Sequence, residues 1–160
     1  MLKSLLFVYL FITLLLPLQL SAAETGASSL NLDSGGIALE GYDPVSYHRQ
    51  GPEKGKNALA LDYNGATYLF SNSDNLETFK ASPDQYLPAY GGWCAWAMLD
   101  GEKVEVDPKT YKIIDGTSYL FYNAFFVNTL TKWNNRAKGE TEKALVIKAQ
   151  SEWELLESAL

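Results

Sequence analysis

Three side chains in this sequence could together bind a soft metal ion: Cys94, His48 and Met98. The chain has one cysteine and one histidine, and Met98 is the only methionine after the initiator. Imidazole, thiolate and thioether groups favour copper over harder cations. Cys94 and Met98 are four residues apart, a spacing that puts them on one face of a helix or of a strand. We therefore name copper as the first candidate cofactor, held by Cys94, His48 and Met98.

Cys94 and His48 each have a structural alternative. Cys94 can be a small buried hydrophobe beside Trp93 and Trp96, because free cysteines are commonly buried. His48 can hold a loop in place by donating one ring nitrogen to a backbone carbonyl. Nearly half a domain separates the two residues, so the sequence does not show whether they meet.

An enzyme is the third interpretation. Cys94 follows Gly91-Gly92, and backbone N–H groups at the first turn of a helix would stabilise its thiolate. With His48 as base, oriented by Asp43 or Asn123, this thiolate could act in a hydrolase or a thiol-exchange enzyme. A lone thiol has no resolving cysteine within the chain. The sequence leaves catalysis uncertain and favours binding.

A ligand pocket without metal is also predicted, around the Gly-Gly turn. A pocket of aromatic side chains could take a small ligand or a segment of a partner protein. Its expected residues are Tyr42, Tyr47, Tyr90, Gly91, Gly92, Trp93 and Trp96. Tyrosine and tryptophan clusters also form cores and interfaces, so composition alone does not choose among these roles.

Length and charge limit the classes of partner. Residues 1–23 carry Lys3, an almost unbroken apolar run and then Ser21-Ala22-Ala23, which is the order of a cleavable signal peptide. We expect a periplasmic or secreted protein with no stable membrane anchor after cleavage. The rest has 12 basic and 19 acidic side chains, a net charge of about −7 that repels nucleic acid and anionic lipid. The candidate partners are a metal ion, a small ligand or a periplasmic protein.

The remaining residues have the right length for one domain. Residues 24–35 are rich in Ser, Gly, Ala and Asn and are expected to be a flexible N-terminal segment, followed by a domain over 36–160. Asn64-Gly65 and Asp115-Gly116 predict two hairpins, which we expect to join in one antiparallel sheet. Carboxylates beside the turns, such as Glu105, are expected to be solvated surface.

Helical spacing completes the expected fold. A helix is predicted to begin at Ser73 and a short one at Ser82-Pro83. Two buried helix faces are predicted in the C-terminal part, formed by Phe126, Leu130 and Trp133 and by Leu145, Ala149, Trp153 and Leu156. The fold class is therefore α+β, a single domain in which a small antiparallel sheet built from hairpins packs against several helices.

Two segments, GYDPVSYH at 41–48 and YGGWCA at 90–95, resemble motifs of the exported YHS domain-containing proteins. The resemblance extends from about Gly36 to the helix of Trp153, so residues 36–160 are identified as a YHS-like domain. Classical YHS modules, which are similar to TRASH-type heavy-metal domains, carry cysteines proposed to bind soft metals. Those positions are Ser71 and Asn75 here, and neither side chain can act as a thiolate. The resemblance does not bring the family's metal site to these two residues.

Overall fold

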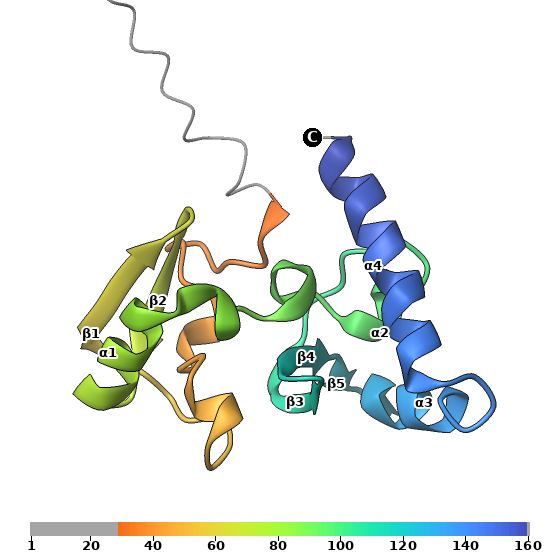
Figure 1. The fold of residues 1–160 in the computed structure, drawn as a ribbon, viewed down its shortest axis with the longest axis horizontal. Helices are drawn as coiled ribbons and strands as arrows, with labels where there is room; N and C mark the ends of the chain where they lie inside the picture. The colour runs from red at the N-terminus through yellow and green to blue at the C-terminus, as the bar shows by residue number, and fades with distance from the viewer. Residues whose placement is uncertain (1–28, 160) are drawn as a thin grey trace, which may run out of the picture.

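The computed structural model describes residues 29–159, so the predicted signal peptide lies outside the described residues. One lobe holds strands β1 (Lys56–Tyr63) and β2 (Ala66–Phe70) and helix α1 (Ser73–Ala81) (Figure 1). The other holds α2 (Ala95–Met98), β3 (Asp107–Ile114), β4 (Thr117–Phe121), β5 (Asn123–Ala124), β6 (Val127–Asn128), α3 (Thr129–Arg136) and α4 (Glu142–Ser158). The predicted α+β single-domain class is confirmed. Within 29–159, no helix is both long and apolar enough to cross a membrane.

Both predicted hairpin turns are present. Asn64 and Gly65 have φ values of 48° and 81°, and Asp115 and Gly116 have 48° and 82°. These positive values are what a tight two-residue turn requires.

The expected single sheet is wrong, because the described strands form three separate two-stranded sheets. Other segments occupy the free edges of β2 and β4. Ile37 makes a parallel bridge to Thr67 of β2, and Cys94 makes one to Leu120 of β4. These edges of β2 and β4 are therefore not open to the other hairpin.

The two hairpins repeat one another with a shift of 51 residues. Phe70 pairs with Lys56, and Phe121 pairs with Asp107, and the register of each hairpin then slips at the same point. The same shift carries the left-handed turn at Leu39–Gly41 to the one at Tyr90–Gly92. The domain therefore contains two similar halves, each with a left-handed turn, a hairpin and then a helix.

The buried apolar residues form two cores, and the first also includes Leu120 of β4 from the second half. Phe70 and Phe79 are fully buried in the first core, and Trp133 is fully buried in the second. Helix α4 packs on the second core through Leu145, Ala149 and Trp153, as its spacing predicts.

The prediction for Phe126 is wrong, because this residue is fully exposed. After β4 the chain forms the short hairpin β5–β6, and α3 begins only at Thr129. Phe126 therefore lies before the helix, at the tip of that hairpin.

The described part of the N-terminal segment is docked. The Asn31 N–H donates to the Gly91 carbonyl at 2.9 Å, and Trp93 Nε1 donates to the Ser29 carbonyl at 2.7 Å. A Cβ at Gly91 would lie 3.1 Å from Leu30 Cδ2, tighter than nearly all such contacts. Glycine at this position allows the segment to pack closely on the turn.

Candidate functional site

The Cys94 thiol is enclosed by the protein. The residue is fully buried at the N-terminus of α2, and its Sγ lies 3.4 Å from the Tyr122 backbone nitrogen and 3.4 Å from Thr129 Oγ1. The Thr129 hydroxyl donates its single proton to the Tyr122 carbonyl at 3.0 Å. The Cys94 S–H must therefore be the donor to Thr129, while the Tyr122 N–H donates to the sulfur. This arrangement encloses the thiol among hydrogen-bond partners of the protein itself.

Met98 lies on the same helical turn as Cys94, as the four-residue spacing predicts. Its backbone N–H donates to the Cys94 carbonyl at 3.0 Å. Met98 is fully buried within the second core, so its thioether packs against apolar side chains.

His48 has a different neighbourhood. Its ring packs edge-on against Tyr86 at a centroid distance of 5.3 Å, and burial lowers its pKa below 6.5. None of its described hydrogen bonds or ring contacts involves Cys94 or Met98. Across residues 29–159, no group of three or more His, Cys, Asp or Glu side chains is placed to hold a metal ion.

The carboxylate of Asp43 organises a buried polar network in the first half. It accepts hydrogen bonds from the Val45 N–H at 2.9 Å, from the Ser71 N–H and hydroxyl at 2.9 and 2.8 Å, and from Asn75 Nδ2 at 2.6 Å. Asp43 is fully buried. Ser71 and Asn75 thus both bind the Asp43 carboxylate. Asp43 is occupied by these donors and does not orient His48.

Cys94 is the counterpart of Asp43 in the second half. The 51-residue shift carries Asp43 to Cys94 and Ser71 to Tyr122. In each half the side chain accepts the backbone N–H of the residue just after the second strand, at 2.9 Å for Asp43 and 3.4 Å for Cys94. This relation is not among the predictions made from the sequence, although TYLF at 67–70 and SYLF at 118–121 signal it.

The predicted aromatic pocket is divided between the two cores. Tyr47 belongs to the first core and Tyr90 to the second, and burial raises the pKa of both phenols. Each hydroxyl has a partner, since Tyr47 donates to the Pro108 carbonyl and Tyr90 to the Val146 carbonyl. These tyrosines serve packing.

The other predicted pocket residues lie apart as well. Tyr42 is buried in the first core, beneath the Lys54 ammonium at 4.3 Å. Trp93 and Trp96 are half-buried beside the second core, and Trp96 lies 6.0 Å from the Arg136 guanidinium. Of the predicted set, only Gly92 lines a hollow that lies between the two left-handed turns.

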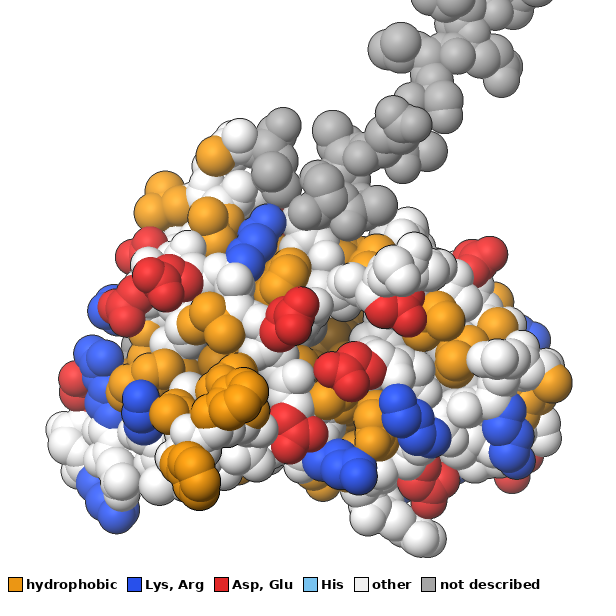
Figure 2. Space-filling view, turned by 180° about the vertical axis from the view of Figure 1, so that it is seen from behind, with side chains coloured by type: hydrophobic (Ala, Val, Ile, Leu, Met, Phe, Trp, Pro, Cys, Tyr) orange, Lys and Arg blue, Asp and Glu red, His pale blue; other side chains and the backbone are white. Residues whose placement is uncertain are grey.

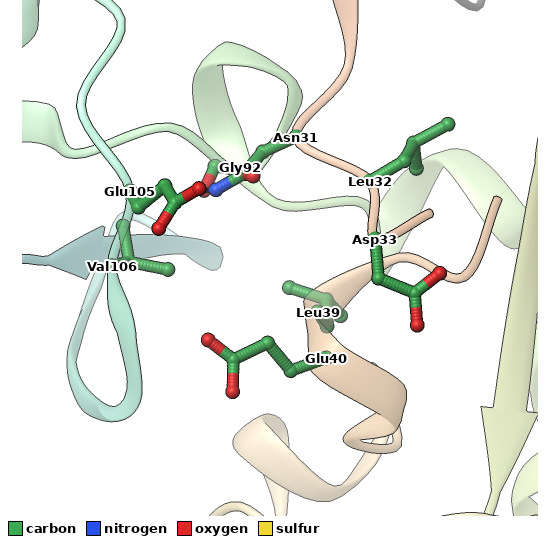
Figure 3. A pocket seen from close by; sticks show the side chains of 8 residues that line it. All are labelled: Asn31, Leu32, Asp33, Leu39, Glu40, Gly92, Glu105 and Val106. Carbon is green, nitrogen blue, oxygen red and sulfur yellow. Dashed lines mark hydrogen bonds between the residues drawn. The ribbon is translucent and has the colours of Figure 1, made fainter. Parts of the chain in front are cut away.

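This hollow has a volume of about 200 Å³ and lies where the two left-handed turns approach each other (Figure 3). Its lining residues are Asn31, Leu32, Asp33, Leu39, Glu40, Gly92, Glu105 and Val106. Three of these carry carboxylates and none is basic. Figure 3 shows Glu40 and Glu105 entering the hollow from different segments of the chain. Glu105 is exposed, as expected, and it also lines this hollow.

The backbone around this hollow is strained. Leu39 and Glu40 have φ values of 56° and 50°, in the left-handed region that non-glycine residues rarely adopt. Such residues cost on the order of 1–3 kcal/mol each and occur most often at functional sites. The left-handed φ of Glu40 sets the direction of its side chain, because a negative φ would place its Cβ elsewhere.

Comparisons of the chain with protein-family models, with curated proteins and with solved structures found no match. The function is therefore inferred from the geometry of these sites.

Proposed function

We propose that this protein is a metal-independent binding domain in which Cys94 is structural. The observation that supports this function is the enclosure of the thiol, whose S–H and lone pair both have protein partners. A metal ion would have to displace the Tyr122 N–H and Thr129 from the sulfur, at a cost to the second half of the fold. The alternatives, copper held by Cys94, His48 and Met98 or a Cys94 nucleophile, each need an accessible thiolate.

The metal question has a direct test. Residues 24–160 are titrated with Cu(I) against a competing chelator under reducing conditions, beside Cys94→Ser and His48→Ala. We expect no tight site that depends on both residues. Tight one-to-one binding lost in both variants would overturn the proposal and establish copper binding.

The ligand site of the proposed domain is the acidic hollow between the halves. Glu40 and Glu105 provide negative charge, and Leu39 and Val106 provide apolar walls. This combination suits an amine or guanidinium group on a short apolar stem, such as a lysine or arginine side chain. The binding class is thus a small cationic ligand or a basic segment of a partner protein.

Calorimetry with N-acetyl-lysine methylamide, and with its Nε-acetylated form, tests this site. We expect weak binding of the charged probe alone, lowered about tenfold or more by Glu40→Gln with Glu105→Gln. Glu157→Gln, an exposed carboxylate on α4, is the matched control. Equal binding of the two probes, or no binding of either, would contradict a cation site.

The resemblance supports an exported YHS-type protein, periplasmic or secreted, as the setting of this function. The motif at 41–48 carries Asp43, which anchors the first half. N-terminal sequencing of the protein recovered from outside the cytoplasm would test export, with cleavage after Ala23 as the expected result.

A further inference from the structure

The short hairpin β5–β6 presents two adjacent phenylalanines to solvent. Phe125 is 88% exposed and Phe126 112% exposed, and the neighbouring Val127 is 38% exposed. Figure 2 shows hydrophobic side chains standing out from the lobe that holds β5, with basic side chains nearby. Single exposed apolar residues are ordinary, but a contiguous apolar group at a projecting tip marks an interaction site.

The backbone at this tip is strained. Phe125 and Phe126 have φ values of 48° and 66°. A two-residue hairpin turn needs positive φ at both positions, which favours Asn-Gly or Asp-Gly, and a bulky residue there is an outlier. The chain uses Asn64-Gly65 and Asp115-Gly116 at its other two hairpins. Two phenylalanines are therefore a costly choice for the turn alone.

The repeat shows that the fold does not need this hairpin. Two residues separate β2 from α1, whereas seven separate β4 from α3. In the first half, β2 leads to α1 without the additional residues. Neither phenylalanine belongs to either core. The tip adds an exposed apolar surface to a unit that is complete without it.

We propose that the Phe125–Phe126 tip inserts into the surface of a phospholipid bilayer. The tip is convex and consists of two rings, too little for a stable protein interface, which buries about 1,200–2,000 Å² and needs a complementary surface. A bilayer requires no complementary shape, only apolar side chains that reach the boundary between headgroups and acyl chains. This surface is distinct from the acidic hollow and independent of its ligand.

The base of the hairpin is polar and carries charges of both signs, since the Asp107 carboxylate accepts from Asn123 Nδ2 at 3.4 Å. Asn123 pairs with Asn128 across the two strands, and Asn123 Nδ2 donates to Thr110 Oγ1 at 3.0 Å. Lys109, adjacent to Thr110, and Lys132, in the first turn of α3, are exposed and form none of the described ion pairs. These side chains are available to phosphate groups of the headgroup layer.

Vesicle sedimentation tests the proposal. Residues 24–160 contain every described element and both cores, and they omit the predicted signal, whose apolar run would bind lipid by itself. The probes are vesicles of phosphatidylcholine, alone and with about a quarter phosphatidylglycerol. We expect the protein to co-sediment with both. The variant Phe125→Ser with Phe126→Ser should lower the partition coefficient about tenfold or more, because two inserted rings are lost.

A matched control removes two exposed apolar side chains elsewhere. Ile147 and Leu155 on α4 are 56% and 64% exposed, so Ile147→Ser with Leu155→Ser should leave vesicle binding unchanged. Lys109→Gln with Lys132→Gln should weaken binding to the anionic vesicles only. Near-ultraviolet circular dichroism confirms that each variant is folded.

Three outcomes would overturn the proposal. They are no vesicle binding by the unmodified protein, equal loss in the tip and control variants, or tip-dependent self-association without vesicle binding. The last would assign the tip to a second copy of the chain. None of these measurements uses the amine probes, so failure here is separate from failure of the proposed function.

Discussion

The two halves of this molecule share one hairpin register but use different chemistry to hold it. In the first half the Asp43 carboxylate accepts the Ser71 N–H, and in the second the Cys94 sulfur accepts the Tyr122 N–H. The position requires a buried acceptor for a backbone donor that would otherwise be unpaired. Cys94 supplies this acceptor in the second half.

The halves also differ in the segment that connects the hairpin to its helix. The first half passes directly into α1, whose Asn75 completes the Asp43 network. The second inserts β5–β6 and its exposed tip before α3. One half is thus distinguished by its buried polar contacts and the other by an added surface.

Removing the Asp43 carboxylate, the buried acceptor of the first half, should have the largest effect on stability. Asp43→Ala leaves the backbone N–H groups of Val45 and Ser71 and the Asn75 amide without their buried acceptor. We expect a loss of about 3–5 kcal/mol in the free energy of unfolding, measured in urea. A loss below about 1 kcal/mol would mean that the network does not anchor the first half.

Adding a Cβ at Gly55, where it would meet the backbone of Leu69, should have the second-largest effect on stability. A Cβ at Gly55 would lie 2.4 Å from the Leu69 carbonyl carbon, whereas the 51-residue shift places Val106 at this point of the second half. Gly55→Ala should cost about 2–3 kcal/mol by chemical denaturation, because backbone must move. Gly139→Ala, whose Cβ would meet only the Arg136 carbonyl oxygen at 3.8 Å, is the control. Equal losses of stability for Gly55→Ala and Gly139→Ala would show that the first half, like the second, accepts a Cβ at this point.

Removing Cys94, the buried acceptor of the second half, should destabilise the protein less than removing Asp43. Cys94→Ala leaves a small cavity and an unpaired Tyr122 N–H, for an expected loss of about 1–3 kcal/mol. Cys94→Ser keeps an acceptor and should lose less. Labelling of Cys94 by a thiol reagent should also be slow in the native state and fast in urea. Rapid native labelling would contradict the enclosed thiol.

The smallest expected effect concerns pH and His48. Burial lowers its pKa in the folded state below 6.5, so the unfolded state binds more protons as the pH falls through 6.5. Stability should therefore decrease slightly on acidification from pH 6.5 down to the folded-state pKa. Urea midpoints compared with those of His48→Gln would isolate this contribution. If the stability of His48→Gln has the same pH dependence as that of the unmodified protein, the dependence comes from other groups.

The local elements of this protein follow from short stretches of its sequence. Asn64-Gly65 and Asp115-Gly116 specify their turns because both positions need positive φ, and Leu145, Ala149 and Trp153 specify one face of α4 through helical spacing. Cys94 and Met98 fall on one helical turn for the same reason. These properties depend on neighbours a few residues away.

Contacts between distant parts of the chain set how those elements pack together. The hairpins lie in separate sheets, with Ile37 and Cys94 bridged to β2 and β4, and the Cys94 thiol is enclosed by Tyr122 and Thr129 from a later part of the chain. Phe126 has the spacing of a buried helix residue but lies in an inserted hairpin. Contacts between residues far apart in sequence leave no periodic signal, so only the folded chain reveals them.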